Sequence, residues 1–378
     1  MASVMRSAAP QRSSNLDLIR LITASAVIFG HAYLLNRVAE PKVFGEGVGL
    51  LRVKVFFVIS GALLARSWMR DPHLGRYLAR RALRILPALF VVVLFCAFIL
   101  GPLVSDLGVR EYFSAPLLFE YLSNLRFEMR YYLPGVFEQN PYPRSVNGSL
   151  WSLSVEVLMY LVLPLWLWVG VKLRAPRLMA WAGVIAICAW SLYWAHVTPP
   201  HGMVRIYGTS MRQAVHLAPF FMIGALYGVH GWHKRLSLQW ALGGAVLLTF
   251  FTPTGALVTV ASFLLLPYAV LALAFAKDPT FAGFSRFGDY SYGIYLWGFP
   301  VQQLLIMLWG GPMHPLLNFA LALPISLGLA ALSWHGVEKV FMRLRPETPD
   351  PPAAHAGVVP LPRPVAAPIP PHRALVRH

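Results

Sequence analysis

The sequence is poor in charged residues and in cysteine. Only 12% of its 378 residues are charged, whereas 57% are hydrophobic. A water-soluble globule of this length would need more polar side chains to cover its surface, so membrane lipid must cover much of it. The two cysteines, Cys96 and Cys188, lie inside apolar runs, and no cysteine or histidine spacing matches a metal site. We therefore expect neither a disulfide framework nor a bound metal.

Long apolar segments fill most of the chain. A helix needs about 20 apolar residues to cross a bilayer, and ten segments approach that length. They predict an all-α, polytopic integral membrane protein with about ten transmembrane helices. The predicted spans are 16–35, 47–65, 84–104, 149–170, 178–197, 213–229, 238–254, 256–276, 291–309 and 315–335. A further stretch, 112–126, is interrupted by Glu120, Asn124 and Arg126 and is expected to be interfacial or re-entrant.

The two ends of the chain differ from the middle in composition. Residues 1–14 are polar and basic and carry no secretory cleavage pattern, which predicts an N-terminal tail. Residues 346–378 are dominated by proline and alanine, can bury too little apolar surface to fold, and are expected to be disordered. The middle, 15–345, is then one membrane domain.

Basic residues outnumber acidic ones by 32 to 15, which gives a formal net charge of +17. They gather at the ends of the apolar segments, where topology determinants and anionic lipid contacts lie, and this placement argues against nucleic acid as a partner. Because positive loops stay cytoplasmic, the N-terminus is expected inside, and ten spans put both tails in the cytosol. The densest basic run consists of Arg66, Arg70, Arg76, Arg80, Arg81 and Arg84.

The first predicted span carries two ionisable residues, which are costly inside a bilayer and therefore candidates for function. Arg20 and His31 are eleven residues apart, which on a helix is about 16 Å along the axis and about 20° around it. His31 lies toward the outer end, where it could take a proton from an acceptor hydroxyl. The alternative is a histidine that only hydrogen-bonds a neighbouring helix.

A second candidate group precedes the third span. Arg80, Arg81 and Arg84 are spaced to cluster on one side of a helix start. Arginine forks match phosphate oxygens, so the cluster suits a phosphorylated cytosolic ligand. Basic residues at this place are also what a cytoplasmic loop requires, and the charges alone leave both interpretations open.

The fourth span opens with a polar stripe. Ser152, Glu156 and Tyr160 recur at intervals of four and should share one helix face. Glu156 lies at the depth of the first-span histidine and could orient its imidazole. A structural salt bridge with Arg52 or Lys54 of the second span is the alternative.

Five segments, taken in order, carry a resemblance to a known family. They are 16–20 followed by His31, then 56–61 with Ser60, then Arg81 with Arg84, then 149–156 running into Tyr160 and Pro164, and finally 290–297 with Pro300. This order, within a ten-span layout, resembles acyltransferase family 3, whose members O-acylate bacterial surface polysaccharides and related sugars. The resemblance spans nearly the whole predicted membrane domain.

The resemblance implies a function and a site. His31 would be the essential catalytic histidine and Arg20 its partner, and Arg81 with Arg84 would contact the donor. No cofactor would be bound; acyl-CoA, commonly acetyl-CoA, would be the co-substrate, a glycan the acceptor, and the bacterial inner membrane the location. A covalent acyl intermediate on the histidine, on Ser60 or on Ser152 stays open beside direct transfer.

A different class of protein would use the same residues differently. In a transporter or flippase for a glycan or lipid-linked sugar, Arg20, His31 and Glu156 would be substrate or proton relay groups. Such a protein would work without acyl-CoA. The sequence shows no internal repeat of the kind that marks many transporters.

Overall fold

The computed structural model describes residues 14–43, 46–196, 204–206, 209–232, 235–250, 255–276 and 288–347. Both predicted tails lie almost wholly outside these residues. The described residues through Pro346 belong to one structural unit.

The described chain is built from helices, as the apolar segments predict, and each of the ten predicted spans overlaps a helix among the described residues. Two short hairpins join helices: β1 Lys42–Val43 with β2 Glu46–Gly47, and β3 Arg205–Ile206 with β4 Thr209–Ser210, both antiparallel. The main helices are α1 Ser14–Leu35, α2 Val48–Arg70, α3 Leu74–Phe95, α7 Trp151–Lys172, α8 Pro176–His196, α9 Met211–His230, α10 Leu238–Phe250, α11 Gly255–Ala274, α12 Ser291–Trp309 and α13 Pro315–Ser333.

Among the described residues, seven helices are long and apolar enough to cross a membrane. They confirm a helical membrane protein, whereas the number ten stays a prediction. The described part of α10 has only 13 residues, and α9 and α12 carry polar side chains among their apolar ones. Short pieces extend other helices: a π-helical turn Cys96–Leu100 and α4 Gly101–Val104 continue α3, and a turn Trp334–Glu338 and α14 Lys339–Met342 continue α13.

The predicted interfacial stretch 112–126 forms no spanning helix. It folds into α5 Val109–Ser114, α6 Pro116–Tyr121 and a 3-10 turn Leu122–Arg126. The chain then runs without regular structure to a second 3-10 turn, Gly148–Leu150, which leads into α7. Asn140 fastens this loop to α12 by donating to the side-chain and backbone oxygens of Gln303, both at 2.9 Å.

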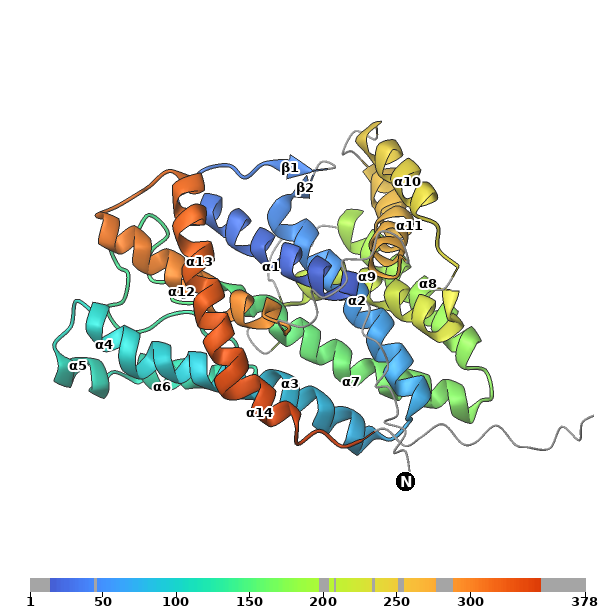
Figure 1. Cartoon of the computed structure of the whole chain (residues 1–378), viewed down its shortest axis with the longest axis horizontal. Helices are drawn as coiled ribbons and strands as arrows, with labels where there is room; N and C mark the ends of the chain where they lie inside the picture. The colour runs from blue at the N-terminus through green and yellow to red at the C-terminus, as the bar shows by residue number, and fades with distance from the viewer. Residues whose placement is uncertain are drawn as a thin grey trace, which may run out of the picture. The chain divides into compact units, whose positions relative to one another are not determined.

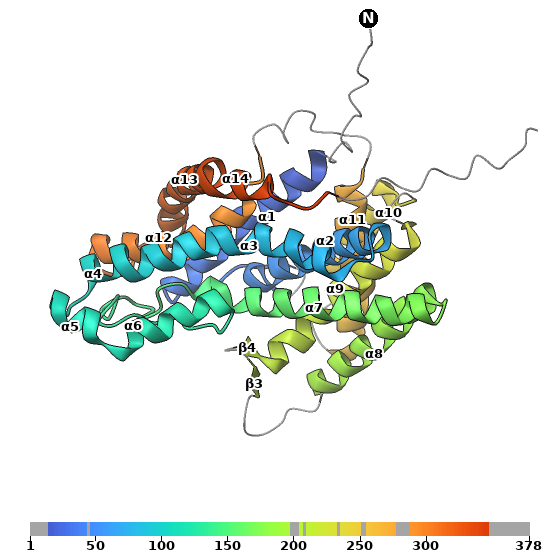
Figure 2. The same ribbon diagram turned by 90° about the horizontal axis from the view of Figure 1, so that it is seen from below.

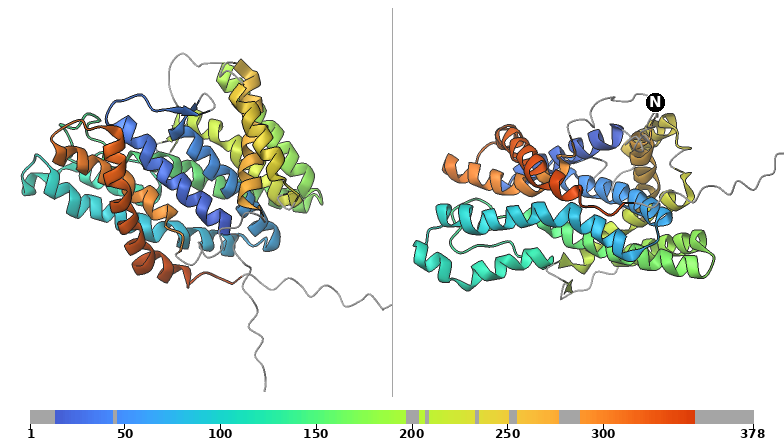
Figure 3. Two further views of the ribbon diagram at one scale, coloured as in Figure 1. Left: turned by 45° about the horizontal axis from the view of Figure 1, so that its top comes forward. Right: turned by 60° about the horizontal axis from the view of Figure 1, so that its bottom comes forward.

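Helix α2 lies at the centre of the packing. Helix α1 runs between α2 on one side and α12 with α13 on the other, while α8, α10 and α11 lie beyond α2 (Figures 1 and 3). Helices α3 and α7 run side by side (Figure 2). Small residues let α2 and α9 approach closely: a methyl group at Gly61 of α2 would overlap the Phe221 carbonyl of α9, and one at Gly224 of α9 would overlap the Val58 carbonyl of α2.

Candidate active site

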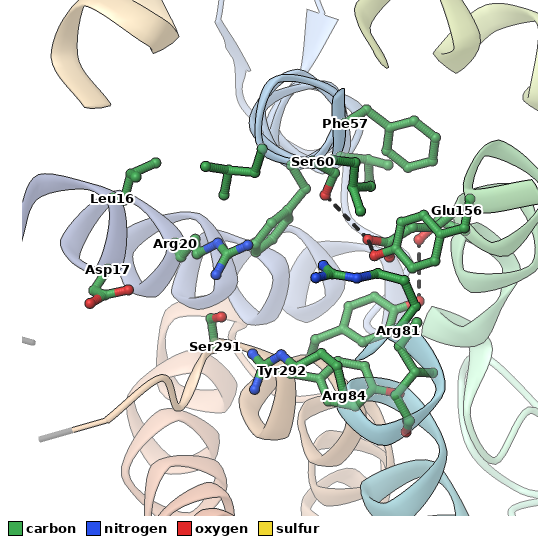
Figure 4. A pocket seen from close by; sticks show the side chains of 18 of the residues that line it. Leu16, Asp17, Arg20, Phe57, Ser60, Arg81, Arg84, Glu156, Ser291 and Tyr292 are labelled. Carbon is green, nitrogen blue, oxygen red and sulfur yellow. Dashed lines mark hydrogen bonds between the residues drawn. The ribbon is translucent and has the colours of Figure 1, made fainter. Parts of the chain in front are cut away.

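A cavity of about 260 Å³ lies where α1, α2, α3, α7 and α12 meet (Figure 4). Most of the residues predicted from the sequence line it, although they come from distant parts of the chain. The predicted site residues in its wall are Arg20, Ser60, Arg81, Arg84, Ser152, Glu156 and Tyr160. His31 and Arg80 are not among the lining residues.

Two of the arginines are neutralised by acids that the sequence analysis did not single out. Asp289 accepts hydrogen bonds from Arg20 at 2.9 Å and from Arg84 at 2.6 Å. Arg84 also donates to Glu338 at 3.1 Å. Both acids are buried, and a buried charge is tolerated when it is paired in this way. Arg20 therefore lies with the arginines of the cavity rather than beside His31.

Arg81 differs from these two. Its guanidinium points into the same space as those of Arg20 and Arg84 (Figure 4). Its Nε atom is buried without a hydrogen-bond partner in the described chain, and no described acid pairs with it. Its electrostatic neighbours include the phenols of Tyr160 and Tyr77. Arg81 thus brings an unneutralised positive charge to the cavity wall.

Arg80 points elsewhere, although it belongs to the same predicted cluster. It donates to Asp71 at 2.9 Å, and Arg76 binds the same carboxylate. The hydrogen bonds from Arg76 and Arg80 hold the pKa of Asp71 well below its usual range. Asp71 ends α2, so Arg80 fastens the connection between α2 and α3.

The polar stripe of α7 faces the cavity as its spacing predicts. Glu156 accepts hydrogen bonds from Ser60 at 3.2 Å and from Tyr160, and Ser152 pairs with the Tyr295 hydroxyl at 3.2 Å. The alternative salt bridge is not formed within the described residues: Lys54 pairs with Glu46, and Arg52 binds backbone carbonyls. No hydrogen bond joins Glu156 to His31.

His31 lies one helical turn beyond the cavity. Val27, which lines the cavity, precedes it by four residues on α1. The imidazole is 5% exposed and packs edge-on against Phe299, with ring centroids 5.1 Å apart. Its Nδ1 atom is buried, and neither ring nitrogen forms a hydrogen bond within the described residues. Within the described residues, the imidazole of His31 therefore does not serve as a hydrogen-bonding link between helices.

Arg52, which the sequence suggests only as a salt-bridge partner of Glu156, lies beside His31 instead. It is buried, interacts electrostatically with His31, and donates to the carbonyls of Ala26 at 3.0 Å and Val27 at 2.9 Å. Gly30 makes this approach possible, because a methyl group there would overlap the Arg52 Nη1 atom. The available signal was an arginine inside an apolar span, which marks a candidate by default.

Comparisons with known proteins bear on this arrangement. The family model described as "Acyltransferase domain" matches residues 13–335. The chain belongs to acyltransferase family 3. Its family and its relatives' names make it an O-acyltransferase, and the transporter alternative draws no support from them. No solved structure matches the chain significantly.

Three proteins with similar sequences show which kinds of protein this acyltransferase resembles. The "O-acetyl transferase" of Shigella phage Sf6 is 27% identical, over 88% of this chain and 96% of the relative. "Nodulation protein 10" of Rhizobium leguminosarum bv. viciae is 29% identical, over 88% of this chain and 94% of the relative. A "Peptidoglycan O-acetyltransferase" of Listeria monocytogenes is 28% identical, over 77% of this chain and 49% of the relative.

Proposed function

We propose that this acyltransferase moves an acyl group, in the first instance acetyl, from cytosolic acyl-CoA to a hydroxyl of a cell-surface or exported polysaccharide. It acts as a multi-pass protein of the bacterial inner membrane with both termini in the cytosol. The names of the phage and Listeria relatives support acetyl as the group transferred, and the basic loops support the orientation.

The observation that carries the donor assignment is the state of Arg81. Arg81 is half-buried, and its buried Nε atom has no described hydrogen-bond partner. Such a charge without an acid partner is costly, and a bound phosphate would compensate it through charge-assisted hydrogen bonds. Four arginines line the cavity beside two acids, Asp17 and Glu156. Two of these arginines, Arg20 and Arg84, are already paired with Asp289 and Glu338 behind the wall, which leaves Arg81 as the guanidinium with no described acid partner among the three predicted arginines of the cavity. A phosphate of CoA matches the charge of Arg81, and the guanidinium groups of Arg20 and Arg84 lie beside it as further hydrogen-bond donors.

The chemical step then takes place at the inner end of the cavity. The thioester extends along apolar side chains such as Val53 and Phe57 toward Val27, and so approaches His31. The imidazole removes the proton of the acceptor hydroxyl as its oxygen attacks the thioester carbonyl carbon. The carbon–sulfur bond breaks, and the CoA thiolate leaves and takes up the proton, so that ester and free CoA result.

Glu156 contributes from within the cavity. Its carboxylate accepts the Ser60 hydroxyl hydrogen bond, which is the arrangement a base needs if Ser60 carries the acyl group transiently. Direct transfer is our preferred route. In that route Ser60 replaced by Ala retains transfer, whereas a covalent route through Ser60 loses it.

The test uses the protein in nanodiscs with radiolabelled acetyl-CoA and a bacterial surface-glycan extract. Wild type should move label into glycan, and His31→Ala should reduce transfer by about 10²–10⁴-fold, the range typical of a lost general base. His230→Ala is the matched control, because His230 packs against Trp232 and lines neither described cavity. Undiminished transfer by His31→Ala would falsify the assignment of the base, and failure of wild type to use any acyl-CoA would overturn the proposed donor.

A further inference from the structure

A second cavity, of about 300 Å³, is formed by the loop before α7, the first turn of α7 and the segment around β4 and α9. Its wall combines aromatic faces with positive charge. The residues that give it this character are Tyr131, Tyr132, Tyr142, Trp151, Arg205 and Arg212. None of its lining residues is an acid.

This cavity lies close to the catalytic histidine. Tyr142 in its wall packs against Phe299, with ring centroids 6.4 Å apart, and Phe299 packs against His31. Gly148, also in the wall, would place a methyl group 2.7 Å from ring carbons of Phe299. The ring of Phe299 therefore stands between the second cavity and the imidazole.

The wall is held in place before any ligand binds. Gln303 of α12 donates to the carbonyl of Tyr142 at 2.8 Å and to that of Ser145 at 2.7 Å. Ser210 supplies a buried hydroxyl that has no hydrogen-bond partner in the described chain. A fixed wall with an unused polar group is what a preformed ligand site offers.

The chemistry of the wall matches a sugar. The two faces of a pyranose ring carry C–H groups that pack on aromatic rings, and its hydroxyls need hydrogen-bond partners along the rim. Burial raises the pKa of Tyr131 to about 12, so its phenol stays a hydrogen-bond donor at neutral pH. Arg205 and Arg212 favour a carboxylate or phosphate on the ligand.

We propose that this second cavity binds the acceptor, as an acidic sugar residue of the glycan whose reacting hydroxyl points toward His31. The inference rests on the proposed function and adds where the acceptor lies. Donor and acceptor then reach His31 from separate cavities, which meet at the start of α7: Ser152 lines the first and Trp151 the second. Displacement of the Phe299 ring would open the way between them.

The test measures glycan binding without donor, so that failed binding and failed transfer are separate results. Soluble peptidoglycan fragments, which carry carboxylates, are titrated onto the nanodisc protein by calorimetry, with neutral maltoheptaose for comparison. Tyr132→Ala and Arg212→Ala should each weaken binding of the acidic fragments at least about 10-fold, the loss expected for one aromatic or charged contact. Tyr132 is 46% exposed and Arg212 is also exposed, so these variants should fold.

Matched controls are Tyr193→Ala, at a residue that is 60% exposed and lines neither cavity, and Arg126→Ala, whose side chain is 76% exposed. Neither should change binding. Wild type that binds no acidic fragment, or cavity variants that bind as tightly as the controls, would overturn the inference. If binding behaves as expected while acetyl transfer is absent, the acceptor site stands and the proposed function fails.

Discussion

The two ends of α1 both carry buried charge but differ in how it is balanced. At the Arg20 end, Asp289 and Glu338 neutralise Arg20 and Arg84. At the His31 end, no described acid contacts the imidazole, and Arg52 binds two backbone carbonyls. A costly ionisable residue in a span can therefore serve either the fold or the chemistry, and its partners decide which.

If the buried acids at the Arg20 end serve the fold, the largest predicted effect is a loss of stability when Asp289 is changed. Asp289→Asn removes the carboxylate shared by Arg20 and Arg84, and loss of one partner of a buried pair costs about 3–5 kcal/mol. Thermal unfolding, followed by a thiol-reactive dye at the buried Cys96, should show a clear fall in midpoint. Glu128→Gln breaks the more exposed pair with Arg130 and should cost less than about 1 kcal/mol. Equal losses in the two variants would contradict a structural role for Asp289.

Steady-state kinetics can show whether the adjacent residues Arg80 and Arg81 of α3 have different roles. Arg81→Ala should raise the KM for acetyl-CoA about 10- to 100-fold, because a charged hydrogen bond to the donor contributes about 1.5–3 kcal/mol. Arg80→Ala should leave that KM within about twofold and instead lower the unfolding midpoint, because Asp71 loses a partner. Steady-state kinetics at saturating acceptor separates the two. A shared rise in KM would mean that the cluster acts as one unit.

At the His31 end of α1, the prediction concerns the position of Arg52 relative to α1. Gly30→Ala places a methyl group where the Arg52 guanidinium lies, which should displace Arg52 or α1 and lower kcat about 10-fold with little change in the KM for donor. Gly328→Ala is the matched control, because that position on α13 has open space around it. Normal turnover by Gly30→Ala would show that the position of Arg52 is not needed.

The smallest effect is a pH dependence outside the membrane-spanning segments. The pKa of Asp71 is lowered in the folded protein by Arg76 and Arg80, so its stabilising contribution is present above the ordinary carboxyl pKa of about 4 and is lost as the pH falls below it. The midpoint of thermal unfolding should therefore differ between wild type and Asp71→Asn by a constant amount from about pH 5 to about pH 8. This difference should shrink below about pH 4. A difference that grows on acidification would have the wrong sign.

The fold could be predicted because apolar length and helical spacing are local properties. The ten helical segments and the stripe of Ser152, Glu156 and Tyr160 follow from them. The number of membrane crossings stays a prediction, because the 13 described residues of α10 and the polar residues of α9 and α12 fall near the limits of length and apolarity.

The partners of the charged residues could not be predicted in the same way. Asp289 is 269 residues from Arg20, and only the packing of α12 against α1 brings them together. Arg52 is a possible partner of Glu156 by sequence alone, because position along each predicted span gives depth in the membrane but not the side of the helix that faces a neighbour. The structure separates them around the helix axes: Arg52 faces the carbonyls of α1, and Glu156 faces Ser60.

The contact between Gly61 and Phe221 has a consequence for residues near the two cavities. At Gly61 and Gly224 the backbones of α2 and α9 approach each other with no side chain between them, so a bulkier residue at either position would push the two helices apart. Arg52, which holds the turn of α1 below His31, is on α2, and Arg212 of the second cavity begins α9. The proposed acceptor cavity and the residue that contacts the turn of α1 before His31 are thus carried by two helices in direct backbone contact.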